Sequence, residues 1–189
     1  YMDFITNRRF RMSILCRADQ PMNRSLDNNQ IMDFYLTANF RPKTKNSDPT
    51  KEIVFETPQG NGLTSHDPAT GALFLELSES SPRPVAAKEL VARAQKRLKA
   101  DTDEKIRQVL IANGLQLVFR GYINIYLNDV PIVKEVREKP VAHPLSRYQA
   151  SLSGRSSVTT AVRGTTNTDL SSKVIIYSLD GTRTSKDII

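Results

Sequence analysis

Three consecutive helix patterns followed by one alternating strand constrain the fold of this 189-residue chain more than any other feature. The first helix should begin after Asp67, a good N-cap, with Pro68 at its first position, and should end near Ser80. The next two cover PVAAKELVARAQKRLKA and DTDEKIRQVLIANGLQLVF, after which YINIYL alternates apolar and polar residues. Three helices and a strand in this order are typical of a winged-helix domain.

Apolar spacing predicts which faces of the second and third helices are buried. The expected inward residues are Leu90, Val91, Ala94 and Leu98 in the second helix and Ile106, Val109, Leu110 and Leu117 in the third. Asp101 and Glu104 have the spacing of a capping box at the start of the third helix. Gly114 falls inside that helix, where glycine costs about 1 kcal/mol, so we expect it to kink or end the helix.

Period-two patterns predict strands before these helices. Residues 10–16 place Phe10, Met12, Ile14 and Cys16 on one face, and residues 31–40 do the same with Met32, Phe34, Leu36, Ala38 and Phe40. EIVFET and GLTS flank PQGN, which predicts a hairpin with Gly60 in the turn. Residues 41–51 are polar and contain proline, and we interpret them as a linker.

We therefore predict an α+β fold in three parts. A small β-containing segment with its linker occupies 1–51, a winged-helix-like domain 52–139, and a linker with a truncated C-terminal helical module 140–189. In the last part, Asp169 should cap a helix that Gly181 stops, with Leu170, Val174 and Leu179 facing inward. Because the chain begins and ends inside structured patterns, we interpret it as a piece of a longer protein.

Charge and cysteine content limit the partners and the compartment. The net charge is +7 and the pI about 9.6, which suits an acidic partner such as nucleic acid, an anionic membrane or an acidic protein surface. Cys16 is the single cysteine, so no internal disulfide is possible, which favours a reducing, cytoplasmic environment. No apolar run approaches the ~18–20 residues that a membrane span needs.

Residue types that carry catalysis or bind cofactors are sparse. His66 and His143 lie in separate loops without a second ligand at metal spacing, so we expect structural or surface roles for both. Cys16 lies on an apolar strand face, which favours a buried structural thiol. Gly60 and Gly62 belong to a hairpin turn that no helix follows directly. We therefore predict no catalytic, metal or cofactor site in this chain.

The second helix carries most of the clustered positive charge, at Lys88, Arg93, Lys96, Arg97 and Lys99. In a winged helix these residues could follow phosphates, but the helix that usually reads DNA is the third. Its start contains Asp103 and Glu104, which oppose a DNA backbone. We therefore interpret the basic residues as a solvated helix face and do not expect specific nucleic-acid binding.

Three stretches of the sequence resemble one family of bacterial enzymes. YMDFITNRRFRMSILCR combines the pair Asp3 and Phe4, a core of Arg9, Phe10 and Arg11, and an apolar strand. KPVAHPLSRYQA is similar to a proline-led linker, and IIYSLDGTRTSKDII to a C-terminal helical module marked by the run Leu179–Arg183. Together they resemble the region that follows the catalytic domain in class I methyltransferases with a methyltransferase regulatory domain, including rickettsial protein-lysine methyltransferases that act on outer-membrane proteins.

The resemblance implies a parent methyltransferase that uses S-adenosylmethionine. The glycine-rich cofactor turn of that family is absent here, so the resemblance places the cofactor and the catalytic residues in a domain upstream of Tyr1. It suggests that the chain is a non-catalytic regulatory or substrate-engaging region whose partners are the methyltransferase domain and a protein substrate. The alternatives are a winged-helix DNA-binding regulator and a stand-alone protein-interaction module.

Arg9 and Arg11 are the candidate docking residues. On a strand they point the same way and stand about 6.6–7 Å apart, a spacing that suits paired carboxylates. Our hypothesis is that they dock this region onto the methyltransferase domain; the alternative is an exposed strand edge.

Overall fold

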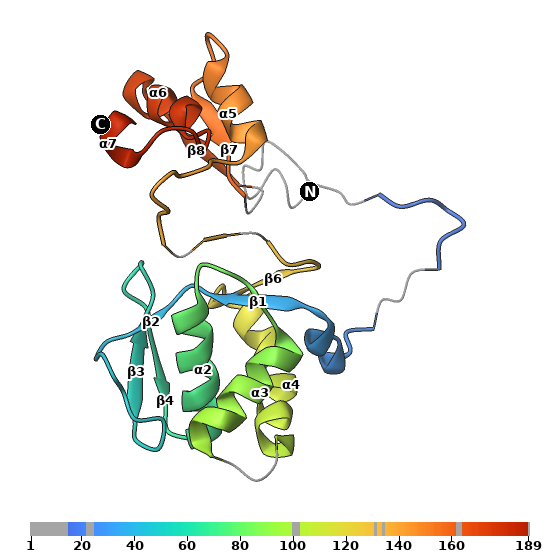
Figure 1. The fold of residues 1–189 in the computed structure, drawn as a ribbon. Coiled ribbons are helices and arrows are strands. Elements are labelled where there is room, and N and C mark those ends of the chain that lie inside the picture. Colours follow the sequence, from blue (N-terminus) through green and yellow to red (C-terminus); the bar gives the residue numbers. More distant parts are fainter. Residues whose placement is uncertain are drawn as a thin grey trace.

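The computed structural model describes residues 15–21, 25–99, 103–130, 132–133, 135–161 and 164–188. Within them the fold is α+β with small antiparallel sheets, as predicted. Figure 1 shows a lower group of elements, from η1 (Asn28–Asp33) to β6 (Ile123–Tyr126). It also shows an upper group, from α5 (Pro144–Ser151) to α7 (Ser185–Ile188), joined to the first by the chain that follows β6.

A three-stranded sheet holds the lower group together, and its middle strand comes from early in the chain. The order is β5-β1-β6, with β1 at Tyr35–Ala38, β5 at Val85–Ala86 and β6 at Ile123–Tyr126. In β1, Leu36 lies opposite Val85 on one side and Ile125 on the other. β1, which the domain prediction assigns to 1–51, therefore shares a sheet with β5 and β6, which it assigns to 52–139. The boundary at residue 51 itself stays a prediction.

The three predicted helices are present at α2 (Pro68–Ser80), α3 (Ala87–Leu98) and α4 (Glu104–Phe119). Asp67 caps α2 by accepting a hydrogen bond from the Thr70 N–H at 3.0 Å, and Pro68 occupies the first turn. The apolar residues of α2 are buried nearly all round, because α3, α4 and two sheets surround it. α3 instead buries one stripe that includes Leu90, Val91 and Ala94, as expected from its spacing.

A second small sheet covers another side of α2. Its order is β2-β3-β4, with β2 at Arg41–Pro42, β3 at Ile53–Glu56 and β4 at Gly62–Ser65. The β3–β4 hairpin confirms the predicted one, and Gly60 supplies the positive φ of 82° that its turn requires. Phe40, Phe55 and Phe74 pack in a cluster with ring centroids 5.2–5.5 Å apart, which joins this sheet to α2.

The strand predicted at 31–40 is confirmed only at Tyr35–Ala38, which is β1. Asn28–Asp33 instead form a 3-10 helix, η1, because the Asp27 carboxylate accepts a hydrogen bond from the Asn29 N–H and caps it. Arg41 and Pro42, predicted to lie in a linker, pair with β3 instead.

The N-cap of α4 is Asp103, which makes no side-chain capping bond. Asp101, the other member of the predicted capping box, lies outside the described residues, so the capping box stays a prediction. Gly114 does not end the helix, contrary to one expectation, because the helix continues to Phe119. A Cβ at Gly114 would lie 2.8 Å from Cγ1 of Ile31 in η1, so glycine is present because another element packs against it.

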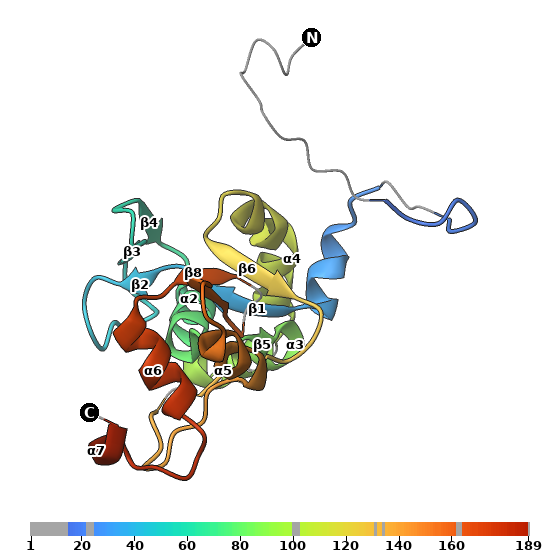
Figure 2. The same cartoon turned by 90° about the horizontal axis from the view of Figure 1, so that it is seen from above.

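The upper group contains α5 (Pro144–Ser151), a hairpin of β7 (Ser157–Thr159) and β8 (Thr165–Asn167), α6 (Leu170–Ser178) and α7 (Ser185–Ile188). Figure 2, seen from above, shows α5 and α6 side by side, in agreement with their contacts. Asp169 caps α6, as predicted, by accepting from the Ser172 N–H at 2.8 Å. The Leu179–Arg183 run ties this group to its linker, because Gly181 N–H donates to the Pro140 carbonyl at 3.1 Å.

The inward face predicted for α6 is wrong. Leu170 is 79% exposed and Val174 58% exposed, and only Leu179, just past the helix, is half-buried. None of the residues of α6 is buried, although the helix contains two further isoleucines and a tyrosine. Spacing identified an apolar stripe correctly, but nothing in the described chain covers it.

Candidate partner-binding groove

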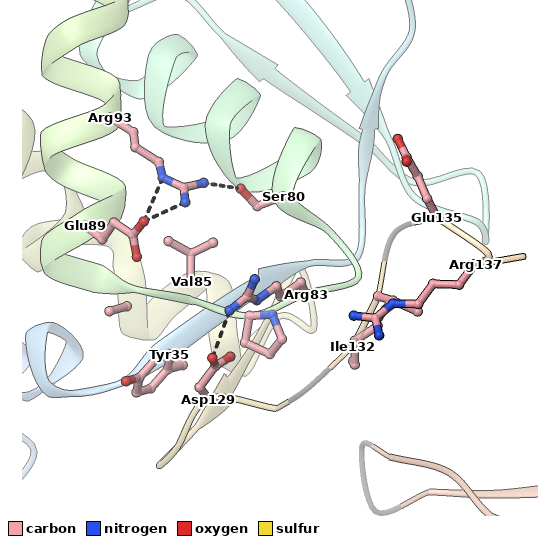
Figure 3. Close-up of a pocket in the computed structure, with 13 residues that line it drawn as sticks. Tyr35, Ser80, Arg83, Val85, Glu89, Arg93, Asp129, Ile132, Glu135 and Arg137 are labelled. Atoms are coloured by element: carbon pink, nitrogen blue, oxygen red, sulfur yellow. Dashed lines mark hydrogen bonds and ion pairs between the residues drawn. The ribbon is translucent and has the colours of Figure 1, made fainter. Parts of the chain in front are cut away.

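A groove of 580 Å³ runs along the edge of the three-stranded sheet beside β5. One wall consists of β5 itself with the residues around it on α3 and β1. The other consists of the chain after β6, represented by Ile132, Val133, Glu135 and Arg137. We call this feature the β5 groove; Figure 3 shows the side chains that line it.

Two arginines beside β5 have partners within the chain. Arg83, just before β5, lies 3.0 Å from Asp129 and so links the two walls of the groove. This carboxylate raises the pKa of the Arg83 guanidinium. On α3, Arg93 lies 2.6 Å from Glu89 and also donates to the Ser80 hydroxyl at 3.1 Å. These two arginines are therefore held in place by partners within the chain.

Arg137 differs from the other two arginines of the groove. Within the described part of the chain it is exposed and makes no hydrogen bond or ion pair. Figure 3 shows it across the groove from Arg93 and Glu89. Its guanidinium is thus the cation of this groove that is available to a ligand.

The backbone of β5 also faces the groove. The Ala87 N–H donates to the Phe34 carbonyl at 3.0 Å, and Ala86 lies opposite Tyr35. Phe34 and Ala87 are thus a hydrogen-bonded pair. Because hydrogen-bonded and non-hydrogen-bonded pairs alternate along an antiparallel ladder, the next pair, Tyr35 and Ala86, is a non-hydrogen-bonded pair. The Ala86 N–H therefore points away from β1, toward the outer edge of β5, and so does the carbonyl of Pro84 two residues earlier.

The structure places the predicted site residues as follows. Arg9 and Arg11 lie outside the described residues, so their docking role stays a hypothesis. His143 caps α5, accepting from the Leu145 N–H at 3.3 Å, and His66 lies 3.1 Å from Glu52; both are held by local partners, as expected. Cys16 is exposed, which contradicts the predicted buried thiol.

The described residues do not fit a metal ion or S-adenosylmethionine. No three histidine, cysteine or carboxylate side chains among them gather closely enough to hold a metal. Every sheet they form is antiparallel, whereas doubly wound α/β folds bind a nucleotide cofactor at the carboxyl ends of parallel strands. No described helix is long and apolar enough to cross a membrane.

Sequence reasoning missed the β5 groove because its walls are distant in the chain. Tyr35 and Arg137 line one groove because β1 pairs with β6, the strand that precedes the chain of Arg137. The one local signal was the mixture of apolar and charged residues in VPIVKEVREK, residues 130–139. Of the basic residues singled out on α3, Arg93 lines the groove, whereas Arg97 is ion-paired with Glu76 and Glu79 of α2.

Comparison with known proteins gives consistent matches to rickettsial proteins. No protein-family model matches the chain. The uncharacterized protein RP789 of Rickettsia prowazekii (strain Madrid E) is 30% identical over 200 residues, which cover 100% of this chain and 35% of RP789. The uncharacterized protein RP027 of the same strain is 26% identical over 200 residues, covering 99% of this chain and 79% of RP027.

Two solved structures match over the whole chain. PKMT2 from Rickettsia typhi in complex with AdoHcy superposes with a TM-score of 0.84 at 27% identity, covering 100% of this chain and 38% of PKMT2. A second PKMT2 structure gives a TM-score of 0.83 at 27% identity and covers 39% of that chain. The chain thus spans well under half of PKMT2 and of RP789. The resemblance to rickettsial protein-lysine methyltransferases is confirmed: over its whole length, this chain is similar to a part of PKMT2.

Proposed function

We propose that this chain is a non-catalytic, regulatory or substrate-engaging region of a protein-lysine methyltransferase. The observation that carries the proposal is the match of the entire chain to 38% of PKMT2 at a TM-score of 0.84. AdoHcy, which PKMT2 binds in that structure, is what S-adenosylmethionine becomes after giving up its methyl group. In our proposal that cofactor binds to a methyltransferase domain outside this chain, in the cytoplasm, and not to the antiparallel sheets described here.

The order of elements in the lower group supports a winged-helix-like interpretation in which one strand comes from an earlier part of the chain. Three helices are followed by the strand β6, and β5 lies between the first two helices, as in a winged helix. The strand between β5 and β6 is β1, which precedes the helices in sequence. We propose that β1 takes the place of the second strand of the wing hairpin.

DNA binding is the less favoured alternative. In a winged helix, α4 would enter the major groove. Here η1 packs against α4, with Ile31 directly against Gly114. Arg93 and Arg97, two of the four basic residues of α3, are already paired with carboxylates. No contact of the described residues favours DNA over a protein partner.

The exposed face of α6 supports docking to another domain. Leu170, Val174 and Tyr177 follow the i, i+4, i+7 spacing of one helix face and are 79%, 58% and 53% exposed. An apolar stripe of this kind usually marks a protein interface. Since PKMT2 is much longer than this chain, we propose that the methyltransferase domain covers the stripe, with Arg9 and Arg11 as additional docking residues.

The experiment uses the polypeptide in which this chain accompanies its methyltransferase domain. We expect Val174→Glu to lower methyl transfer to a protein acceptor at least tenfold, because a charge would be buried at the interface. Ser171→Glu, on the same helix but another face, should change activity little. Equal activity of both variants would contradict docking through α6.

Calorimetry of the isolated chain with S-adenosylmethionine tests the non-catalytic assignment separately. We expect no heat of binding. Binding at micromolar cofactor would show that the cofactor site lies in this chain.

A further inference from the structure

We propose that the β5 groove binds an extended acidic segment of a polypeptide, which adds to the outer edge of β5 and places a carboxylate on Arg137. The inference is independent of the methyltransferase assignment, because every group that it uses belongs to this chain.

The backbone part of the proposal follows from the strand register. The Ala86 N–H and the Pro84 carbonyl face the groove, and they supply one donor and one acceptor two residues apart. An extended polypeptide added to a sheet edge uses a donor and an acceptor with this spacing. β5 is the outermost strand of its sheet among the described residues, so this edge is accessible to such a segment.

Side-chain charge determines which segment fits. The groove is lined by three arginines and three carboxylates, and internal ion pairs engage Arg83 with Asp129 and Arg93 with Glu89. Arg137 and Glu135 remain, and no ion pair joins them to each other. The guanidinium of Arg137 has five N–H donors suited to a carboxylate. A carboxylate in the incoming segment would therefore find a cation that no described residue neutralises.

The same lining argues against a phosphate-bearing ligand such as a nucleotide or nucleic acid. A phosphate at Arg137 would carry up to two negative charges into a groove that Glu89, Asp129 and Glu135 also line. A polypeptide brings a single charge together with backbone and apolar groups, which match Pro84 and Val85 on one wall and Ile132 and Val133 on the other.

Fluorescence anisotropy with the 189-residue chain tests the proposal. The probes are labelled peptides, Thr-Val-Glu-Val-Thr, its Gln and Lys analogues, and a Glu peptide with N-methylated backbone amides. We expect the Glu peptide to bind about tenfold more tightly than the Gln peptide, a difference of about 1.4 kcal/mol. The Lys peptide and the N-methylated peptide should bind more weakly than the Glu peptide.

Variants locate the binding. Arg137→Ala should remove the preference for Glu over Gln, and Arg137→Lys should retain part of it. Arg155→Ala removes an exposed arginine from the upper group and should leave the preference intact. Because Arg137 is exposed, its replacement should not unfold the chain, which circular dichroism checks.

NMR provides a second readout, in which the Glu peptide should shift the amide signal of Ala86. Three results would each overturn the proposal: no saturable binding of the Glu peptide at about 1 mM, equal affinity of the Glu and Gln peptides, or an unchanged preference in Arg137→Ala. Tighter binding of a phosphorylated peptide than of the Glu peptide would also overturn it, in favour of a phosphate ligand.

Discussion

Gly114 offers a sharp test of how η1 is packed, because two effects of Gly114→Ala oppose each other. In an exposed helix interior, alanine is more favourable than glycine by about 1 kcal/mol. In this structure, however, the new methyl group would lie 2.8 Å from Cγ1 of Ile31, which is 0% exposed. That carbon is bonded to Cβ of a β-branched, fully buried side chain, so it has little freedom to move aside, and such overpacking costs about 1–3 kcal/mol. We therefore expect a net loss of about 1 kcal/mol in the free energy of unfolding.

Urea denaturation followed by circular dichroism measures this loss, with two accompanying variants. Ala112→Gly, at an exposed neighbouring position, measures the helix-propensity effect and should cost about 1 kcal/mol. Ile31→Ala should cost about 2–5 kcal/mol, because it leaves a cavity in the core. In the Ile31→Ala background, Gly114→Ala should become stabilising, which gives a coupling of about 2 kcal/mol.

A higher urea midpoint for Gly114→Ala in the otherwise unchanged chain would refute this reasoning. It would mean that η1 does not press on α4 at this point and that glycine is there for another reason.

Three further predictions concern other parts of the fold. Asp67→Ala should cost about 1 kcal/mol through loss of the α2 cap, and Asp67→Asn much less. Burial of Asp67 acts to raise its pKa, but hydrogen bonds from Thr70 and Lys105 outweigh it and the pKa is lowered. The charged form of Asp67 therefore stabilises the fold above about pH 4. As the pH falls through the lowered pKa of Asp67, the free energy of unfolding of the parent chain should lose this contribution, whereas that of Asp67→Asn should not. Arg97→Ala should cost about 1–3 kcal/mol in urea, because Glu76, 15% exposed, would lose its partner at 2.7 Å. Finally, residues 28–189 should fold cooperatively, whereas residues 52–189, which lack β1, should show no cooperative thermal transition.

Elements with local signals were predictable from the sequence. The cap at Asp67, the hairpin turn at Gly60 and the cap at Asp169 each depend on residues within a few positions, and all three are observed. The helix stripe through Leu90 was predictable for the same reason, because periodicity fixes which residues share a face.

Features that depend on distant partners were not predictable. Periodicity placed Val174 on a stripe but could not show whether anything packs against it, and it is 58% exposed. Gly114 resembled a helix breaker in the sequence, because Ile31, which leaves no room for a side chain at position 114, lies in a separate element. The candidate site belongs to this class, since Arg137 and Ala86 meet only after β1 has joined the sheet.

The fold explains why a groove exists beside β5. β1 pairs with both β5 and β6, so the position next to β6 that the following chain would occupy in a winged hairpin is already filled. The described residues between β6 and α5 accordingly form no ladder with β6, and the chain turns away instead. The Arg83–Asp129 ion pair then joins this chain to the residues before β5. Among the described residues no backbone ladder joins the two walls, so the outer edge of β5 keeps a donor and an acceptor directed into the groove.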